Sequence, residues 1–253
     1  MLGPVVTALY RLTCLVGYGY VAFWTVENLR DKATASFNEN IIIQSRFLTF
    51  DTLLVQVVYF FLALLLMPTK CVKVKSMLAC VAATTGTVVS VTFWSIYFRD
   101  INLLANVETM RDYPVWHMHV THSLVALTAI LDIILSRPTS LPYFRTLLLL
   151  LVYYGGYALY TEWIISTQKA YAYPMLKALS TSGRIRLYGI VCAGALIVFL
   201  ACSLFIKVLS VGQRRKTKKE KVRNKKPDPS ASPKPKTSPQ ATTGKKAKQK
   251  KQD

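Results

Sequence analysis

The three histidines of this 253-residue chain, His117, His119 and His122, lie within six residues of one another in the stretch VWHMHVTH. Imidazole has its pKa near neutral pH, so a histidine can take up a proton and return it during a reaction. His119 and His122 are three residues apart and share one face of a predicted helix, whereas His117 points elsewhere. Because the three do not share a face, the group does not predict a metal site. Two interpretations stay open, a general base and polar groups that tie helices together.

A hydroxyl that such a base could activate lies in the stretch RFLTFDTLLVQ. At 100° per residue, Thr49, Thr52 and Gln56 fall on one helix face and Asp51 is turned away. A threonine hydroxyl is a poor nucleophile until a base takes its proton, so Thr49 and a histidine would form a nucleophile–base pair. The structural alternative is that the hydroxyl only bonds to its own helix backbone.

The elements that carry these residues are long apolar runs. Six runs approach the length of about 20 residues that crosses a bilayer, near 5–25, 47–67, 78–98, 116–135, 143–165 and 187–210. Runs such as LLVQVVYFFLALLLM have no polar face, which excludes surface helices of a soluble protein, and no alternating pattern indicates a barrel. The predicted fold is all-α, a polytopic membrane protein with six transmembrane helices in a bundle, over a domain of residues 1–211.

The remaining segment, 212–253, is predicted to be a disordered lysine-rich tail. It holds 16 Lys/Arg and three acidic residues from Arg214 to Asp253, or 13 of the 20 net positive charges. The positive-inside rule places this tail in the cytosol, and six spans place the amino terminus there too. We expect the tail to contact anionic lipid headgroups; no aromatic residues interleave the lysines, so nucleic acid is not an expected partner. The ending KKQD resembles a dilysine retrieval signal and favours the endoplasmic reticulum, with the plasma membrane as the alternative.

Depth in the membrane brings the candidate residues to one level. The second and fourth spans run in the same direction, and Thr49 and His122 each lie a few residues inside them, at a depth of about 5 to 10 Å. Trp94 near the end of the third span, and Glu162 and Trp163 near the end of the fifth, reach the same side. With a cytosolic tail, this level faces the lumen or the exterior. Tryptophans at span ends are also ordinary interface anchors.

Three local patterns occur in order along the chain. They are Leu48-Thr49-Phe50 with Gln56; F-W-x5-D-x13-P-x4-H-x2-H at Phe93, Trp94, Asp100, Pro114, His119 and His122; and W-x9-Y-P at Trp163, Tyr173 and Pro174. With them the chain resembles the androgen-induced-gene and androgen-dependent TFPI-regulating proteins, the FAR-17a family. The resemblance covers roughly residues 1–210 and excludes the basic tail.

This resemblance implies a six-span membrane threonine hydrolase that cleaves fatty acid esters of hydroxy fatty acids without a cofactor or a metal. It assigns the catalytic pair to Thr49 and His122. The supporting or substrate-binding candidates are His119, Gln56, Trp94, Asp100, Glu162, Trp163 and Tyr173. The chain departs from the family pattern in the position of Asp51, in Asp132 where the family has glutamate, and in Tyr171 where it has tryptophan. These departures bear on the substrate range more than on the reaction.

The sequence leaves two groups of an ester hydrolase unassigned. The third catalytic group is unassigned, because Asp132 lies about 15 Å along the helix from His122, which leaves Glu162 as the freer candidate. The oxyanion donor is also open, between the Trp94 N–H and Gln56. The alternative functions are a non-catalytic lipid-binding or regulatory scaffold and a channel or carrier, although no inverted repeat supports transport.

Overall fold

The computed structural model describes residues 3–29, 36–105 and 113–224, with side chains up to residue 212. These residues form helices and no strands. The helices in chain order are α1 (Pro4–Asn28), α2 (Phe37–Gln44), α3 (Leu48–Leu65), α4 (Val72–Tyr97), the short 3-10 helix η1 (Ile101–Leu103), α6 (Val115–His119), the π-helix η2 (Val120–Leu124), α7 (Val125–Ser136), α8 (Tyr143–Gln168), α9 (Pro174–Ala178) and α10 (Thr181–Asn224). The chain divides into two compact units, Met1–Arg214 and Arg215–Asp253, and the fold below is that of the first.

Within the described residues, six helical segments are long and apolar enough to cross a membrane. They are Pro4–Asn28, Leu48–Leu65, Val72–Tyr97, Val115–Ser136, Tyr143–Gln168 and Thr181–Gly212. The prediction of an all-α polytopic membrane protein is therefore confirmed. The third span begins six residues before its predicted start, because basic residues extend the helix beyond its apolar run. One of them, Lys75, donates from Nζ to the carbonyls of Met67 at 3.2 Å and Thr69 at 2.7 Å.

The last helix, α10, continues to Asn224. Residues 213–224 are therefore helical where the sequence predicted disorder. Lysine, arginine and glutamate are good helix formers, and a helix already established in the span lengthens without a new nucleation step. The rest of the predicted tail, residues 225–253, lies outside the described part of the chain.

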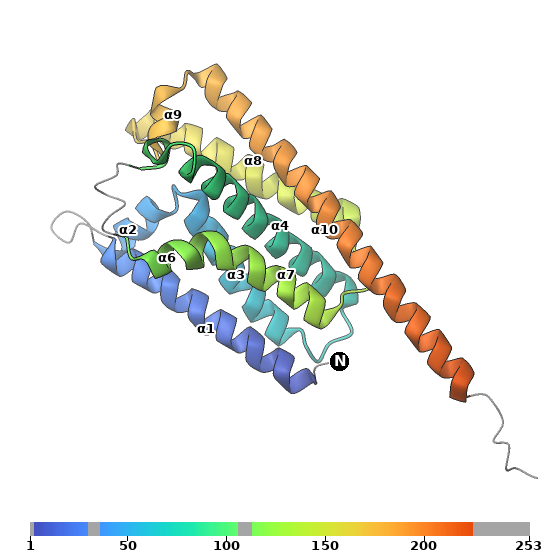
Figure 1. Ribbon diagram of the computed structural model, residues 1–253. Coiled ribbons are helices and arrows are strands. Elements are labelled where there is room, and N and C mark those ends of the chain that lie inside the picture. Colours follow the sequence, from blue (N-terminus) through green and yellow to red (C-terminus); the bar gives the residue numbers. More distant parts are fainter. Residues whose placement is uncertain (1–2, 30–35, 106–112, 225–253) are drawn as a thin grey trace, which may run out of the picture. The chain divides into compact units, whose positions relative to one another are not determined.

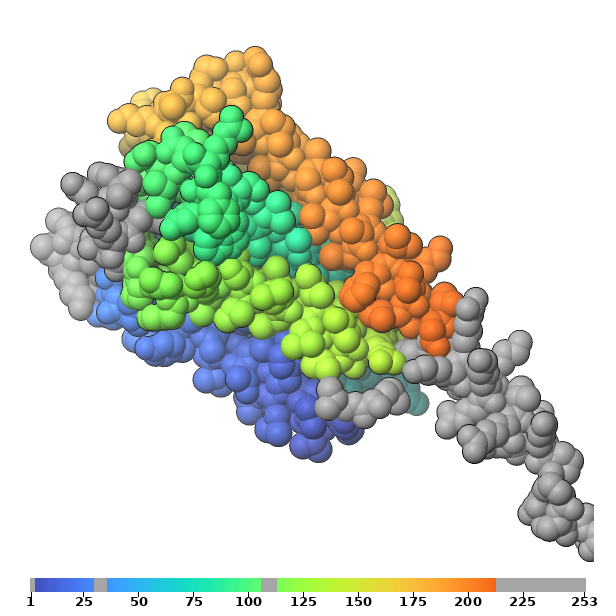
Figure 2. Space-filling model, in the orientation of Figure 1, coloured from blue at the N-terminus to red at the C-terminus, as the bar shows by residue number. Residues whose placement is uncertain are grey.

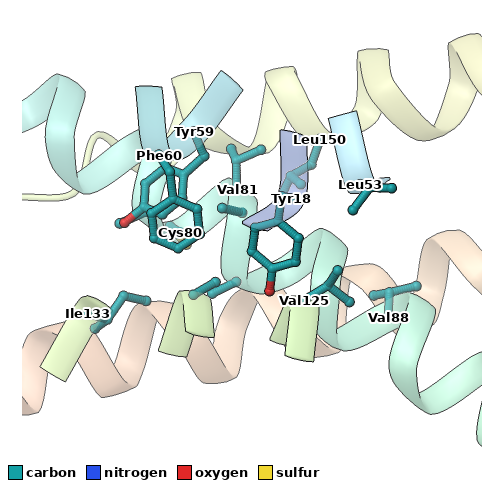
Figure 3. Packing of buried hydrophobic residues seen from close by; sticks show 14 of the residues in the cluster. Tyr18, Leu53, Tyr59, Phe60, Cys80, Val81, Val88, Val125, Ile133 and Leu150 are labelled. Atoms are coloured by element: carbon teal, nitrogen blue, oxygen red, sulfur yellow. The ribbon is translucent and has the colours of Figure 1, made fainter. Parts of the chain in front are cut away.

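The core of the bundle lies among α1, α3, α4 and α7. Figure 1 shows that α6, η2 and α7 follow one another as a single rod between α1 and α4. Figure 3 shows how the buried side chains of these helices meet. Tyr18 of α1 stacks on Phe60 of α3 with ring centroids 5.9 Å apart, and Val125 and Ile133 of α7 are fully buried. Aromatic and branched side chains thus fill the space between the helices.

The outward face of the same helices is apolar. On the face seen in Figure 2, α1, α7 and α4 form a continuous surface. Exposed apolar side chains of these three helices include Leu9, Val16, Val91, Leu127, Leu131 and Ile134. A monomeric soluble protein rarely exposes so extended an apolar surface, whereas a bilayer favours it.

Helices α4 and α7 approach most closely at Gly86. A Cβ atom placed on Gly86 would lie 2.4 Å from the carbonyl oxygen of Val125, the residue at which η2 passes into α7. The neighbour is backbone and cannot turn aside, so only glycine allows this contact. The close approach holds the π-helical turn of η2 against α4.

We therefore expect Gly86→Ala to destabilise the protein by about 1–3 kcal/mol, because the added methyl group forces the two backbones apart. The matched control is Gly156→Ala in α8, whose added Cβ would meet nothing within 4 Å. This control should leave the stability unchanged or raise it by up to about 1 kcal/mol. Thermal unfolding of the purified variants in detergent measures both effects. Equal stability of the two variants would contradict the interpretation of the contact.

Candidate active site

Thr49 and His122 meet inside the bundle. The Thr49 Oγ1 atom lies 3.3 Å from His122 Nε2, and both side chains are half-buried. Thr49 is the second residue of α3, and His122 lies in η2. The pair that the sequence singled out, 73 residues apart, is thus within reach of a proton transfer.

The other ring nitrogen of His122 fixes which tautomer faces Thr49. His122 Nδ1 lies 2.9 Å from the carbonyl oxygen of Met118 and 3.0 Å from Thr121 Oγ1. A carbonyl can only accept, and Thr121 donates its own proton to the carbonyl of His117 at 2.8 Å. Nδ1 therefore carries the hydrogen and Nε2 presents a free lone pair to the Thr49 hydroxyl, the arrangement that a general base requires.

The Met118 carbonyl, together with Thr121, therefore orients the His122 imidazole. Neither Asp132 nor Glu162 contacts this ring nitrogen. The π-helical turn makes the contact with Met118 possible, because it widens the helix locally and changes the direction of its side chains. No sequence pattern pointed to Met118 or Thr121, since a backbone carbonyl leaves no signature in residue type.

Aromatic side chains of α4 hold the imidazole in place. The ring of Phe93 stacks on His122 with centroids 3.5 Å apart and an angle of 14°. Trp94 donates from Nε1 to Ser123 Oγ at 3.0 Å and stacks on His119 with centroids 5.5 Å apart. Both contacts fix η2 against the end of α4 and restrict the ring of His122 to one orientation.

The start of α3 is held by the short helix α2 before it. Ser36 and Glu39 form a capping box, in which Ser36 Oγ accepts from the Glu39 backbone N–H and the Glu39 carboxylate accepts from the Ser36 backbone N–H. Hydrogen bonds from Ser36 lower the pKa of Glu39. Phe47 follows in extended conformation as the N-cap of α3. Thr49 therefore lies in the first turn, where the backbone N–H groups have no helical acceptor.

A cavity of about 180 Å³ opens beside the pair. Its lining is mostly apolar and includes Leu29, Phe50, Leu53, Val89, Ile96, Leu104, Met118, Leu187 and Val191. Among the residues that the structure describes, no Asp, Glu, Lys or Arg side chain lines it. The polar side chains in its wall, besides Thr49 and His122, are Thr25, Gln44, Thr92, Tyr113, His117, Thr121, Tyr154, Tyr157, Tyr173, Tyr188 and Cys192. Such a cavity accommodates a neutral, apolar chain next to the hydroxyl.

His117 was set aside by the sequence analysis, yet it lines the same cavity. Thr25 of α1 donates to the carbonyl of Val21 at 2.7 Å, so its oxygen accepts from His117 Nε2 at 2.8 Å. His117 does point away from His122, as predicted, but toward α1. The contact could not be read from a local pattern because Thr25 lies 92 residues earlier.

Tyr173 is the supporting candidate that the structure brings to the pair. Its ring lines the cavity beside Thr49, and it meets Phe47 edge-on with centroids 5.5 Å apart. The W-x9-Y-P pattern thus includes a residue of the site, although Tyr173 lies 124 positions after Thr49 in the chain.

Four other candidates lie outside the cavity. Gln56 is fully buried and donates from Nε2 to the carbonyl of Ala82 at 3.0 Å, which ties α3 to α4. Asp100 is exposed and caps η1 by accepting from the Asn102 N–H at 3.0 Å. His119 is exposed and contacts Trp94, and Trp163 is exposed on α8. These four side chains support helices or face outward.

The two carboxylates considered as a third group are paired elsewhere. Glu162 accepts from Arg184 Nε at 2.7 Å and from Tyr188 at 2.9 Å, which joins α8 to the start of α10. Asp132 accepts from Arg11 Nε at 2.8 Å and also from Tyr59. Asp132 is fully buried at the other end of the bundle from η2. Neither carboxylate is free to orient His122.

Six apolar spans and a half-buried hydroxyl–imidazole pair define a multi-pass membrane protein with a candidate hydrolytic site. Within the described ranges, no group of three or more His, Cys, Asp or Glu side chains is placed to hold a metal ion. The chain belongs to the FAR-17a/AIG1-like protein family, whose model matches residues 6–207. The resemblance drawn from the three sequence patterns is thereby confirmed. No curated protein and no solved structure matches the chain.

Proposed function

We propose that this protein is a membrane-embedded lipid ester hydrolase that uses Thr49 as its nucleophile and His122 as its general base. The observation that carries the proposal is the 3.3 Å contact between Thr49 Oγ1 and the unprotonated Nε2 of His122. A hydroxyl becomes a useful nucleophile only next to such a base. Membership of the FAR-17a/AIG1-like family supports the same class of reaction through the resemblance stated above.

The reaction follows the logic of hydroxyl-based acyl transfer. His122 Nε2 takes the proton of Thr49 as Oγ1 attacks the ester carbonyl carbon. The imidazolium, stabilised through its Nδ1–H by the Met118 carbonyl, then gives this proton to the departing alcohol. A water molecule activated by the same nitrogen releases the acid and restores the Thr49 hydroxyl.

The substrate class follows from the cavity and from the family. An apolar wall without charged side chains suits an acyl chain that enters laterally from the bilayer. The resemblance implies fatty acid esters of hydroxy fatty acids, in which a secondary alcohol is the leaving group. The charged carboxylate of such a substrate would remain outside the cavity, at the level of the membrane interface.

The test is covalent labelling by a fluorophosphonate probe together with hydrolysis of a fatty acid ester of a hydroxy fatty acid. Wild-type protein should be labelled and active, and Thr49→Ala should lose both properties. The matched control is Thr52→Ala, because Thr52 lies in the same helix but bonds to the Tyr153 hydroxyl at 2.9 Å and does not line the cavity. This control should keep labelling and hydrolysis.

Other outcomes point to other functions. Labelling that survives in Thr49→Ala would move the nucleophile to another residue. A wild-type protein with neither labelling nor hydrolysis would favour the non-catalytic scaffold that binds lipid or regulates a partner.

We also propose a membrane and an orientation for this protein. The chain lies in the endoplasmic reticulum membrane with both termini in the cytosol, so the site opens near the lumenal leaflet. The 13 net positive charges from Arg214 onward support this orientation through the positive-inside rule and through attraction to anionic headgroups.

A further inference from the structure

An ester hydrolase must stabilise the negative charge that develops on the carbonyl oxygen during attack. The two donors suggested by the sequence are occupied. The Trp94 N–H is bonded to Ser123 at 3.0 Å, and the Gln56 amide is bonded to the Ala82 carbonyl at 3.0 Å. Neither side chain lines the cavity. The donor must therefore come from another residue beside Thr49.

Tyr173 lines the same cavity as Thr49, and its neighbours hold it in position there. It is the N-cap of α9 and is followed by Pro174, whose ring restricts the backbone at the helix start. Its carbonyl accepts from the Leu176 N–H at 3.0 Å, and its ring packs against Phe47, which precedes α3. The side chain is thus fixed by both neighbouring helices.

The Tyr173 hydroxyl lies within hydrogen-bonding reach of the Thr49 side chain and of the backbone of Leu48 and Thr49. The backbone hydrogen bonds from Leu48 and Thr49 lower the pKa of Tyr173, so the phenol oxygen accepts them and its own proton stays available. In the first turn of α3, the N–H groups of Phe50 and Asp51 bond to the Phe47 carbonyl.

Tyr157 lies in the same wall of the cavity but cannot take this role, because its hydroxyl donates to the Arg46 carbonyl at 3.0 Å. The Tyr173 proton has no such carbonyl acceptor among the described residues. Of these two phenols, Tyr157 has its proton bound to a carbonyl and Tyr173 does not, within the described part of the chain.

We propose that the Tyr173 hydroxyl is a catalytic hydrogen-bond donor, which lies beside Thr49 and stabilises the carbonyl oxygen as the tetrahedral intermediate forms. This inference rests on the proposed function and adds to it the missing oxyanion donor. As the bond from Thr49 Oγ1 to the carbonyl carbon forms, the π electrons of the carbonyl move to its oxygen. The Thr49 proton passes to His122 Nε2, and Tyr173 keeps its own proton throughout.

The protonation state of Tyr173 agrees with this role. Burial raises the pKa of Tyr173 to about 12, against a partial lowering by its hydrogen bonds at the start of α3. The phenol therefore retains its proton at neutral pH and can donate it.

The test is steady-state kinetics of Tyr173→Phe, which removes the donor and keeps the ring against Phe47. We expect kcat to fall by about 10²-fold, the usual loss on removing one oxyanion donor, with KM nearly unchanged. The matched control is Tyr160→Phe, which removes a hydroxyl bonded to Ser45 at 3.0 Å and does not line the cavity. This control should keep the wild-type kcat. A Tyr173→Phe variant that is folded and fully active would overturn the inference.

If Tyr173→Phe does not fold, a second measurement tests the same inference. Incorporation of 3-fluorotyrosine at position 173 keeps the hydroxyl but strengthens it as a donor, so kcat should change while KM does not; an unchanged kcat would overturn the inference. Thr49→Ala is assayed beside these variants. An active Thr49→Ala would refute the proposed function itself, whereas an inactive Thr49→Ala with a fully active Tyr173→Phe would refute only the role of Tyr173.

Discussion

Replacement of His122 by alanine is expected to lower kcat for ester hydrolysis by about 10⁴-fold or more, because the nucleophile then has no base. His122 Nε2 is 3.3 Å from Thr49 Oγ1 and its tautomer is fixed by the Met118 carbonyl. Residues that act as a unit are strongly non-additive when they are removed together. The double variant Thr49→Ala/His122→Ala should therefore be no less active than either single variant.

The control for this prediction is His119→Ala in the same segment. His119 is exposed, stacks on Trp94 and does not line the cavity. Its replacement should change kcat by no more than a few-fold. Both variants are measured by product formation in detergent micelles at matched protein concentration. An active His122→Ala variant would exclude the imidazole as the base, and equal losses in both histidine variants would indicate a structural role for the whole segment.

Removal of one partner from the buried ion pair of Arg11 and Asp132 should be the most destabilising single change in the bundle. Arg11 binds both carboxylate oxygens of Asp132, at 2.8 and 2.9 Å, and donates to the Ala63 carbonyl at 3.0 Å. Tyr59 donates to the same carboxylate. The group joins α1, α3 and α7 in a region of low dielectric. Asp132→Ala leaves an uncompensated buried guanidinium, which should cost about 3–5 kcal/mol.

The matched variant for this prediction is the double replacement Arg11→Met/Asp132→Leu, which removes both charges and keeps the volume. It should recover much of the lost stability, since a well-packed apolar pair often equals a buried ion pair. Unfolding by denaturant in mixed micelles gives the free energies. If the double variant were as unstable as Asp132→Ala, the loss would come from packing rather than from the unpaired charge.

The same variant separates stability from catalysis. The folded fraction of Arg11→Met/Asp132→Leu should hydrolyse the ester at the wild-type rate, because Asp132 is paired with Arg11 and not with His122. A loss of kcat in fully folded protein would instead assign Asp132 a part in the reaction.

Much of the fold could be predicted from the sequence because membrane spans are a property of composition and length. The run LLVQVVYFFLALLLM has no polar face, and a bilayer admits such a run only as a helix. The nearness of Thr49 and His122 could also be predicted, since both lie at equal depth in parallel spans and the family resemblance pairs them. Helix ends were less predictable, as Lys73 and Lys75 show at the start of α4, because charged residues can continue a helix that an apolar run begins.

The roles of the supporting residues depended on contacts that residue type does not specify. Gln56 shares the face predicted for Thr49, but it lies two turns, or about 10 Å, further along α3, where it donates to the Ala82 carbonyl of α4 and does not line the cavity. Asp132 is a carboxylate, the kind of side chain that can orient a catalytic histidine. In the structure it is instead paired with Arg11, which lies far away in the chain.

The sequence by itself determined the number and order of the spans and the family, because each follows from local composition or spacing, and through the family resemblance it pointed to Thr49 and His122. Only the tertiary structure decided which nitrogen of His122 faces Thr49, since the Met118 carbonyl reaches Nδ1 through the π-helical turn that Gly86 holds against α4. It also decided that Tyr173, rather than Trp94 or Gln56, lines the cavity together with Thr49. The physical reason is that hydrogen bonds and ring contacts depend on how helices pack, and packing joins residues far apart in the chain.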